Sequence, residues 1–154
     1  MKQVRFRDPS GSVRTGEWVA DDGTPADAET AGEGGEIRFG GRAYDPTEVD
    51  VLPPSNPSKV VCVGRNYAKH ADERGESVPD RPLLFLKGPN AVASHGSEIP
   101  LPAGRTVEYE AELGVVIGEQ SRNVAREHAM DVVAGYTCMV DLSNRDDQER
   151  EQNW

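Results

Sequence analysis

Apolar and polar residues alternate with a period of two in several short segments of the chain, and this pattern predicts strands. The first 52 residues contain three such segments, at 2–6, at 12–20 and in a hairpin over 36–44. Gly40 and Gly41 stand where the hairpin needs its turn. Residues 20–35 are acidic, Gly-rich and without periodicity, so we expect a mobile loop there. Residues 1–52 are therefore expected to form a small β-rich module.

A second region follows a linker at residues 53–58, where three prolines in six residues allow neither helix nor central strand. Its apolar runs predict strands at 59–64, 83–87, 107–118 and 134–143, the first two of them buried. Helical segments are expected at 66–75, with Gly75 as the stop, at 125–133 and from 144 onward. These strands are too few to cover one another's faces, so the region reads as part of a larger sheet structure.

The strand expected at 107–118, VEYEAELGVVIG, carries three carboxylates on one face. Side chains alternate across a strand, so Glu108, Glu110 and Glu112 point one way. The residues between and after them point the other way and are expected to form core: Tyr109, Ala111, Leu113, Val115 and Ile117.

Like charges on one face repel, and a cation among them relieves the repulsion. Asp141 ends another apolar run and supplies a further acid. The arrangement suggests a hard divalent metal held between two strands, and oxygen-only ligands favour Mg²⁺, Mn²⁺ or Ca²⁺ over zinc. The alternative is the solvated polar face of an edge strand.

Two further groups of residues could carry chemistry. His70 and Glu73 stand at positions i and i+3 of an expected helix, where a carboxylate can orient an imidazole that acts as a base. Arg145 could clamp a substrate carboxylate, and Gln148 follows one helical turn later. The alternative in both cases is a solvated surface helix.

Composition narrows the classes of function. The chain has 154 residues and a formal net charge of −10, which disfavours binding to nucleic acid or to anionic membranes. No stretch has the length of a membrane span, and no signal peptide is recognisable, so we expect a cytoplasmic protein. Cys62 and Cys138 lie in apolar runs and are expected to be buried, reduced thiols.

Five segments resemble, in order, the fumarylacetoacetate hydrolase family, and in particular its acylpyruvate hydrolases, 2-hydroxyhepta-2,4-diene-1,7-dioate isomerases and oxaloacetate decarboxylases. They are KVVCVGRNYAKHADERG, PLLFLKGPNAV, VEYEAELGVVIG, VAGYTCMVDLSNRDDQ and QNW. The resemblance implies a mainly β protein with short helices (α+β), in which residues 59–154 form the N-terminal part of a mixed β-sandwich roll. Family members continue past the position of Trp154, so it also implies a chain that is truncated at its C-terminus.

The resemblance also implies roles for individual residues. Glu110, Glu112 and Asp141 match the metal ligands, usually of Mg²⁺ or Mn²⁺, whereas Glu108 falls outside the pattern and is treated as a neighbour. Val140 replaces an asparagine that is common in the family. The expected catalytic and substrate-binding residues are the His70 and Glu73 pair, Lys87, Arg145 and Gln148.

The implied function is that of a metal-dependent enzyme of 2-oxo acid catabolism. It would hydrolyse a C–C bond in acylpyruvates, or isomerise or decarboxylate related 2-oxo acids, through a metal-stabilised enolate. One alternative is an inactive fragment or a subunit that needs a partner. Another is a dehydratase of 2-oxo-3-deoxy sugar acids. The expected partners are a small 2-oxo acid and either a second copy in a homodimer or a second polypeptide that completes the fold.

Overall fold

The structure is a computed structural model, and it describes residues 2–24, 34–148 and 150. Residues 25–33 of the expected mobile loop, and residues 149 and 151–154 of the last expected helix, lie outside the described residues. The chain divides into two compact units. The first comprises residues 1–56, 93–99 and 115–137, and the second comprises 57–92, 100–114 and 138–154.

The first unit is built on a five-stranded antiparallel sheet of order β4-β3-β2-β1-β5. Its strands are β1 Gln3–Arg7, β2 Val13–Val19, β3 Glu36–Phe39, β4 Arg42–Tyr44 and β5 Asp50–Val51. Alternate residues of these strands meet on one face, where Phe6 and Ile37 are fully buried beside Val4 and Trp18. This cluster is a self-contained core, and it confirms the strands expected at 2–6, 12–20 and 36–44.

The β3–β4 hairpin turns at Gly40 and Gly41, as expected. Gly40 has φ 59° and Gly41 has φ 76°, both in the left-handed region that side chains with a Cβ atom avoid. Two small elements were not expected from the sequence: a 3-10 helix at Pro46–Glu48 and the two-residue strand β5. Both are too short to show a periodic pattern.

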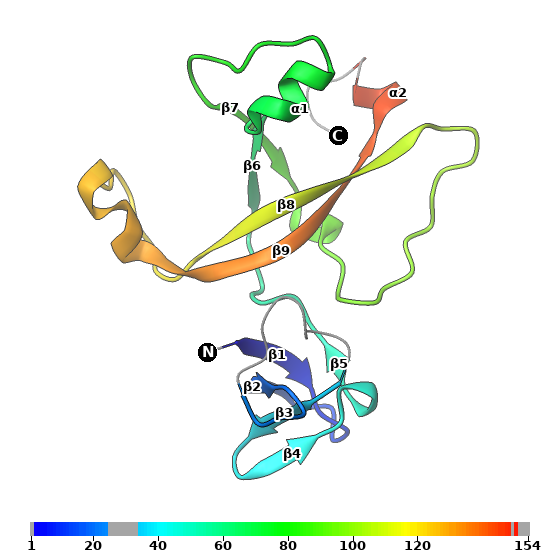
Figure 1. The fold of residues 1–154 in the computed structure, drawn as a ribbon, viewed down its shortest axis with the longest axis vertical. Helices are drawn as coiled ribbons and strands as arrows, with labels where there is room; N and C mark the ends of the chain where they lie inside the picture. The colour runs from blue at the N-terminus through cyan, green and yellow to red at the C-terminus, as the bar shows by residue number, and fades with distance from the viewer. Residues whose placement is uncertain (1, 25–33, 149, 151–154) are drawn as a thin grey trace. The chain divides into compact units, whose positions relative to one another are not determined.

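The second unit contains an antiparallel pair of strands, β6 Val60–Gly64 and β7 Leu83–Lys87. The helix α1, Ala68–Glu73, lies in the connection between them (Figure 1). It stops where expected, because Gly75 adopts φ 67° just beyond its end. A 3-10 helix at Pro89–Ala91 follows β7.

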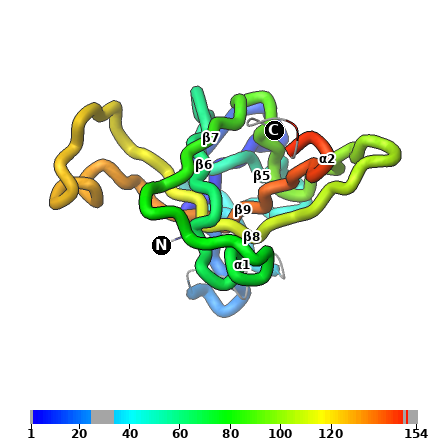
Figure 2. The backbone as a smooth tube through the Cα atoms, turned by 90° about the horizontal axis from the view of Figure 1, so that it is seen from above, coloured from blue at the N-terminus to red at the C-terminus, as the bar shows by residue number. Residues whose placement is uncertain are grey.

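Strands β8 Val107–Ile117 and β9 Val133–Asn144 form a separate two-stranded sheet. They run side by side in both views (Figures 1 and 2). Hydrogen bonds from Gly118 N to Val132 O and from Arg145 N to Thr106 O, each 2.8 Å long, join their ends as an antiparallel hairpin does. A 3-10 helix, Arg126–Val132, leads into β9, and the short helix α2, Arg145–Gln148, follows it.

The structure corrects the expected core on β8. The acidic side of the strand is the more covered one, since Glu110 and Glu112 are half-buried. The apolar side chains opposite are exposed, with 79% of Tyr109 and 61% of Leu113 accessible. Period-two alternation shows which residues share a face, but whether a second layer covers that face depends on other parts of the fold.

The strands expected to be buried at 59–64 and 83–87 are formed, but they are not buried. Their outer side chains are exposed, among them Val61, Val63, Leu84 and Leu86. Only the side that carries Cys62, Phe85 and Lys87 is partly covered.

The mainly β fold with short helices is confirmed, whereas the predicted domain boundaries stay a prediction. Among the described residues, no helix is long and apolar enough to cross a membrane.

Candidate functional site

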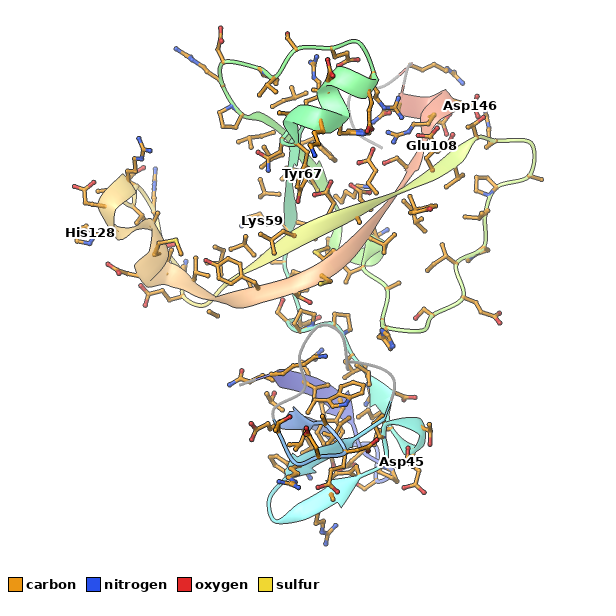
Figure 3. The ribbon with its side chains drawn as sticks, viewed as in Figure 1. Asp45, Lys59, Tyr67, Glu108, His128 and Asp146 are labelled. Carbon is orange, nitrogen blue, oxygen red and sulfur yellow. The ribbon has the colours of Figure 1, made fainter. Side chains whose placement is uncertain are left out.

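The charged residues singled out in the sequence come together in the second unit. Strand β8 contributes Glu108, Glu110 and Glu112, and β9 contributes Asp141. Cations come from other elements: Lys87 ends β7 and Arg145 begins α2. Figure 3 shows the labelled Glu108 near the start of β8, where α2 lies beside the strand. We call this set, with His70 and Glu73 of α1, the acidic site.

Asp141 is paired with Lys87. The Lys87 Nζ donates to Asp141 Oδ1 and, at 3.3 Å, to the carbonyl oxygen of Leu142. Both side chains are well covered, with 16% of Lys87 and 15% of Asp141 exposed. Because both charges are largely withdrawn from water, removing either partner would leave the other as an uncompensated, well-covered charge.

Arg145 is the most heavily bonded cation of the site, and only 12% of its side chain is exposed. Its Nε donates to Glu108 Oε2 at 2.8 Å, its Nη2 to Glu110 Oε1, and its Nη1 to Gln148 Oε1 at 2.7 Å. Burial alone would lower the pKa of Arg145, but the hydrogen bonds to Glu110 and Glu108 raise it. The guanidinium is therefore held as a fixed positive charge.

Glu108 was treated as a mere neighbour in the sequence, and the structure gives it two partners. Its Oε2 accepts from Arg145 and also from Arg74 Nη2, at 2.6 Å. The hydrogen bond from Arg145 is the largest of the effects that lower the pKa of Glu108. The only sequence signal for this contact was the place of Glu108 in the period-two stripe, because Arg74 and Arg145 are distant along the chain.

Glu112 is the site acid whose surroundings favour its neutral form. Burial, and then the nearby charge of Glu110, raise the pKa of Glu112, and Asp141 adds to this. A hydrogen bond with Tyr67 acts in the opposite direction. The Tyr67 hydroxyl also accepts from the backbone N–H of Leu113 at 3.3 Å, so this tyrosine joins the entry of α1 to β8.

His70 lies between two carboxylates. Its Nδ1 is 3.8 Å from Glu73 Oε2, and its Nε2 is 3.5 Å from Glu110 Oε1. These are ion-pair separations that are longer than good hydrogen bonds. The imidazole thus faces the acidic strand from α1, with Glu73 on its far side. His128, by contrast, pairs only locally, with Asp131 at 3.0 Å.

The carboxylates are not arranged as the ligands of one ion. Among the described residues, no group of three His, Cys, Asp or Glu side chains has that geometry. Instead, Glu110 and Asp141 each turn one oxygen to a cation, Oε1 to Arg145 and Oδ1 to Lys87. Each of these hydrogen bonds goes to a single oxygen of its carboxylate.

Neither cysteine forms a disulfide, as expected, but their burial was misjudged. Cys62 is partly covered and Cys138 is exposed. Burial, followed by the charge of Asp141, raises the pKa of the Cys62 thiol. Cys62 therefore stays protonated beside the acidic site.

Comparison with known proteins places the chain in a family. Residues 59–154 match the sequence profile of the fumarylacetoacetate hydrolase C-terminal domain, which is more than half of the chain. The chain belongs to the fumarylacetoacetate hydrolase family. The predicted family and fold are thereby confirmed, and the acidic site lies within the matched region.

Two sequence relatives and one solved structure illustrate the similarity of this chain to known members of the family. A mitochondrial oxaloacetate decarboxylase of Dictyostelium discoideum is 44% identical over 93 residues, which cover 58% of this chain and 42% of the relative. A mitochondrial oxaloacetate tautomerase of Caenorhabditis elegans is 42% identical over 93 residues, covering 60% and 44%. The crystal structure of a 5-carboxymethyl-2-hydroxymuconate delta-isomerase from Mycobacterium smegmatis is 33% identical, with a TM-score of 0.77, and covers 100% of this chain and 59% of that one.

The chain spans about half the length of the curated relatives it matches, for example 49% of one from Archaeoglobus fulgidus. The activities of those whole proteins therefore enter only as proposals for this chain.

Proposed function

We propose that the acidic site belongs to a metal-dependent enzyme that acts on a small 2-oxo acid. The convergence of Glu110, Glu112 and Asp141 with Lys87, Arg145 and His70 in one unit carries this proposal. Support comes from the relatives named for reactions of oxaloacetate, which is itself a 2-oxo acid. The proposed reaction is hydrolysis of a C–C bond in an acylpyruvate, or isomerisation or decarboxylation of a related acid.

The donor atoms of the site suit a hard divalent ion, although in this structure Asp141 and Glu110 are turned to Lys87 and Arg145. Its acids offer only oxygen donors, which Mg²⁺ and Mn²⁺ prefer and Ca²⁺ also accepts. Glu110 and Asp141 raise the pKa of Glu112, so the three carboxylates lie close enough to repel one another. The second oxygens of Glu110 and Asp141 are not engaged by Arg145 or Lys87. We therefore assign Glu110, Glu112 and Asp141 as the residues that would hold the ion.

A bound divalent ion would supply Lewis-acid polarisation of the substrate's oxo group. The protein's own cations would bind the substrate carboxylate, since the planar fork of Arg145 and the ammonium of Lys87 both suit it. Gln148 keeps the fork of Arg145 in one orientation through its 2.7 Å hydrogen bond. Covered by neighbouring side chains, these groups act with little screening by water.

His70 is the group we propose for proton transfer. It faces the acidic strand at Nε2, while Glu73 lies near its Nδ1 and can orient the ring. From this position the imidazole could take a proton from water or from the carbon next to the oxo group. Replacing Glu73 should therefore affect turnover less than replacing His70.

An assay of the purified chain with Mn²⁺ or Mg²⁺ tests the proposal. Oxaloacetate and a series of acylpyruvates would be offered, and loss of the enol absorbance and product formation would be followed. We expect metal-dependent turnover that His70→Ala reduces at least about 100-fold, in line with the usual weight of a general base. Asp141→Asn should also reduce it, because this change removes a proposed metal ligand. His128→Ala is the matched control. Turnover at the wild-type rate in both His70→Ala and Asp141→Asn, or turnover without added metal, would contradict the assignment.

A second candidate is a subunit that works only with a partner. The exposed apolar side chains of Leu84, Leu86, Tyr109 and Leu113 favour it, because such patches mark interaction surfaces. Sedimentation velocity at several concentrations would decide between a monomer, a homodimer and larger aggregates. A well-behaved monomer with turnover would argue against this candidate. We keep the cytoplasmic location as a prediction.

A further inference from the structure

We propose that Glu108 is a positioning residue that keeps Arg145 in place when Glu110 binds a divalent ion. The inference rests on the proposed function, because it concerns how the same site changes when metal binds. It assigns a role to a carboxylate that the family resemblance leaves out.

The guanidinium of Arg145 is shared between two neighbouring acids through different atoms. Its Nε donates to Glu108 Oε2 and its Nη2 to Glu110 Oε1. A metal ion on Glu110 would draw on the same negative charge that now holds Nη2, and the two cations would repel each other. Glu108 would then be the carboxylate that retains the arginine.

Glu108 can do this because it is anchored from the other side as well. The same oxygen, Oε2, accepts from Arg74 Nη2 at 2.6 Å. Arg74 directly follows α1, the helix that carries His70. Glu108 thereby joins three elements of the site: the end of α1, strand β8 and the start of α2.

An ordinary surface ion pair is the competing explanation, since Glu108 is 47% exposed. Isolated exposed pairs contribute little, but charge networks with fixed geometry contribute more. Here Arg145 is only 12% exposed and makes side-chain hydrogen bonds with all three of its nitrogen atoms. The arginine is thus built into the site, and Glu108 is one of the groups that fix it.

A double-mutant cycle measured by calorimetric titration of Mn²⁺ tests the role. In Glu108→Gln, Arg145 is left with Glu110 and competes with the metal, so we expect Mn²⁺ affinity to fall about tenfold, as for other groups that orient a ligand. In the Arg145→Met background there is no arginine to retain. There the Glu108→Gln change should alter Mn²⁺ affinity by no more than about twofold.

Asp72→Asn is the charge control, because it removes an exposed carboxylate from α1. An effect of Glu108→Gln that is equal in both backgrounds, or no larger than that of Asp72→Asn, would overturn the inference and leave the metal site intact. A wild-type chain that binds no Mn²⁺ would instead contradict the proposed function.

A second measurement does not depend on the metal. Hydrogen exchange of the metal-free chain, read by mass spectrometry, should be faster in Glu108→Gln than in wild type for peptides over 68–75 and 145–148. Asp72→Asn should leave 145–148 unchanged. Unaltered exchange of 145–148 in Glu108→Gln would show that Glu108 does not hold Arg145, whatever the metal titration gives.

Discussion

At the scale of single residues, the acidic site is a set of carboxylates whose repulsion is partly offset by two cations. Lys87 is paired with Asp141, and Arg145 bridges Glu108 and Glu110. Burial, and then the charge of Glu110, raise the pKa of Glu112. The acids can therefore lie close together in the metal-free chain because two cations of the same site offset their repulsion.

Lys87→Met should destabilise the metal-free chain, because it leaves the well-covered carboxylate of Asp141 without its cation. We expect a loss of about 1–3 kcal/mol in the free energy of unfolding. Mn²⁺ at a concentration of 100 times its Kd should raise the free energy of unfolding by about 2.7 kcal/mol, because it binds only the folded chain. Urea unfolding with and without Mn²⁺ measures both effects.

Lys59→Met, a change at an exposed lysine just before β6, is the control and should alter neither quantity. An equal loss in both variants would mean that the Lys87–Asp141 pair is not what stabilises this part of the chain.

Asp8 gives a prediction about acid stability in the first unit. Hydrogen bonds, first that from the Ser10 hydroxyl, lower its pKa from 3.8 to about 2. A carboxylate with a lowered pKa in the folded state stabilises it above the unfolded pKa, and this contribution is lost as the pH falls. Stability should therefore decrease from about pH 4 towards pH 2, and less steeply in Asp8→Asn.

Urea unfolding followed by circular dichroism across this pH range measures the slope. Asp50→Asn, at an exposed acid of the same sheet, is the control. Identical slopes for Asp8→Asn and wild type would show that Asp8 is not the group that titrates.

At the scale of elements, local pattern predicted the strands well and their burial poorly. The stripe Glu108, Glu110, Glu112 does lie on one side of β8, as the period of two requires. Which side is covered could not be predicted, because Tyr67 and Arg145 reach the acidic side from distant segments. For the same reason, the pairing of Lys87 with Asp141 left no trace in the sequence.

The β3–β4 hairpin offers a test at this scale. Gly41→Ala places a Cβ atom at φ 76° and should cost about 1–2 kcal/mol of unfolding free energy. Gly135→Ala in β9 is the matched control, because an added Cβ meets open space there. Thermal unfolding of the two variants should differ accordingly. Equal melting temperatures would mean that the turn does not limit the stability of the sheet.

At the scale of the whole molecule, the two units differ in how far they bury apolar surface. The first holds the cluster of Phe6, Ile37, Val4 and Trp18. In the second, Ala71 is the one buried hydrophobic residue among those described, and strands β6 to β8 expose leucine and tyrosine side chains. The family membership could be predicted from ordered motifs, but this imbalance could not, because burial depends on neighbours that local sequence does not specify.

The central claim is that Glu110, Glu112 and Asp141 hold a divalent ion, and a direct titration of the chain with Mn²⁺ tests it. The account predicts one Mn²⁺ per chain, with an affinity that Glu112→Gln and Asp141→Asn each reduce at least tenfold, while Glu119→Gln, at an exposed acid just beyond β8, leaves it unchanged. Absence of saturable binding, or binding that is unaffected by the two site substitutions, would contradict it.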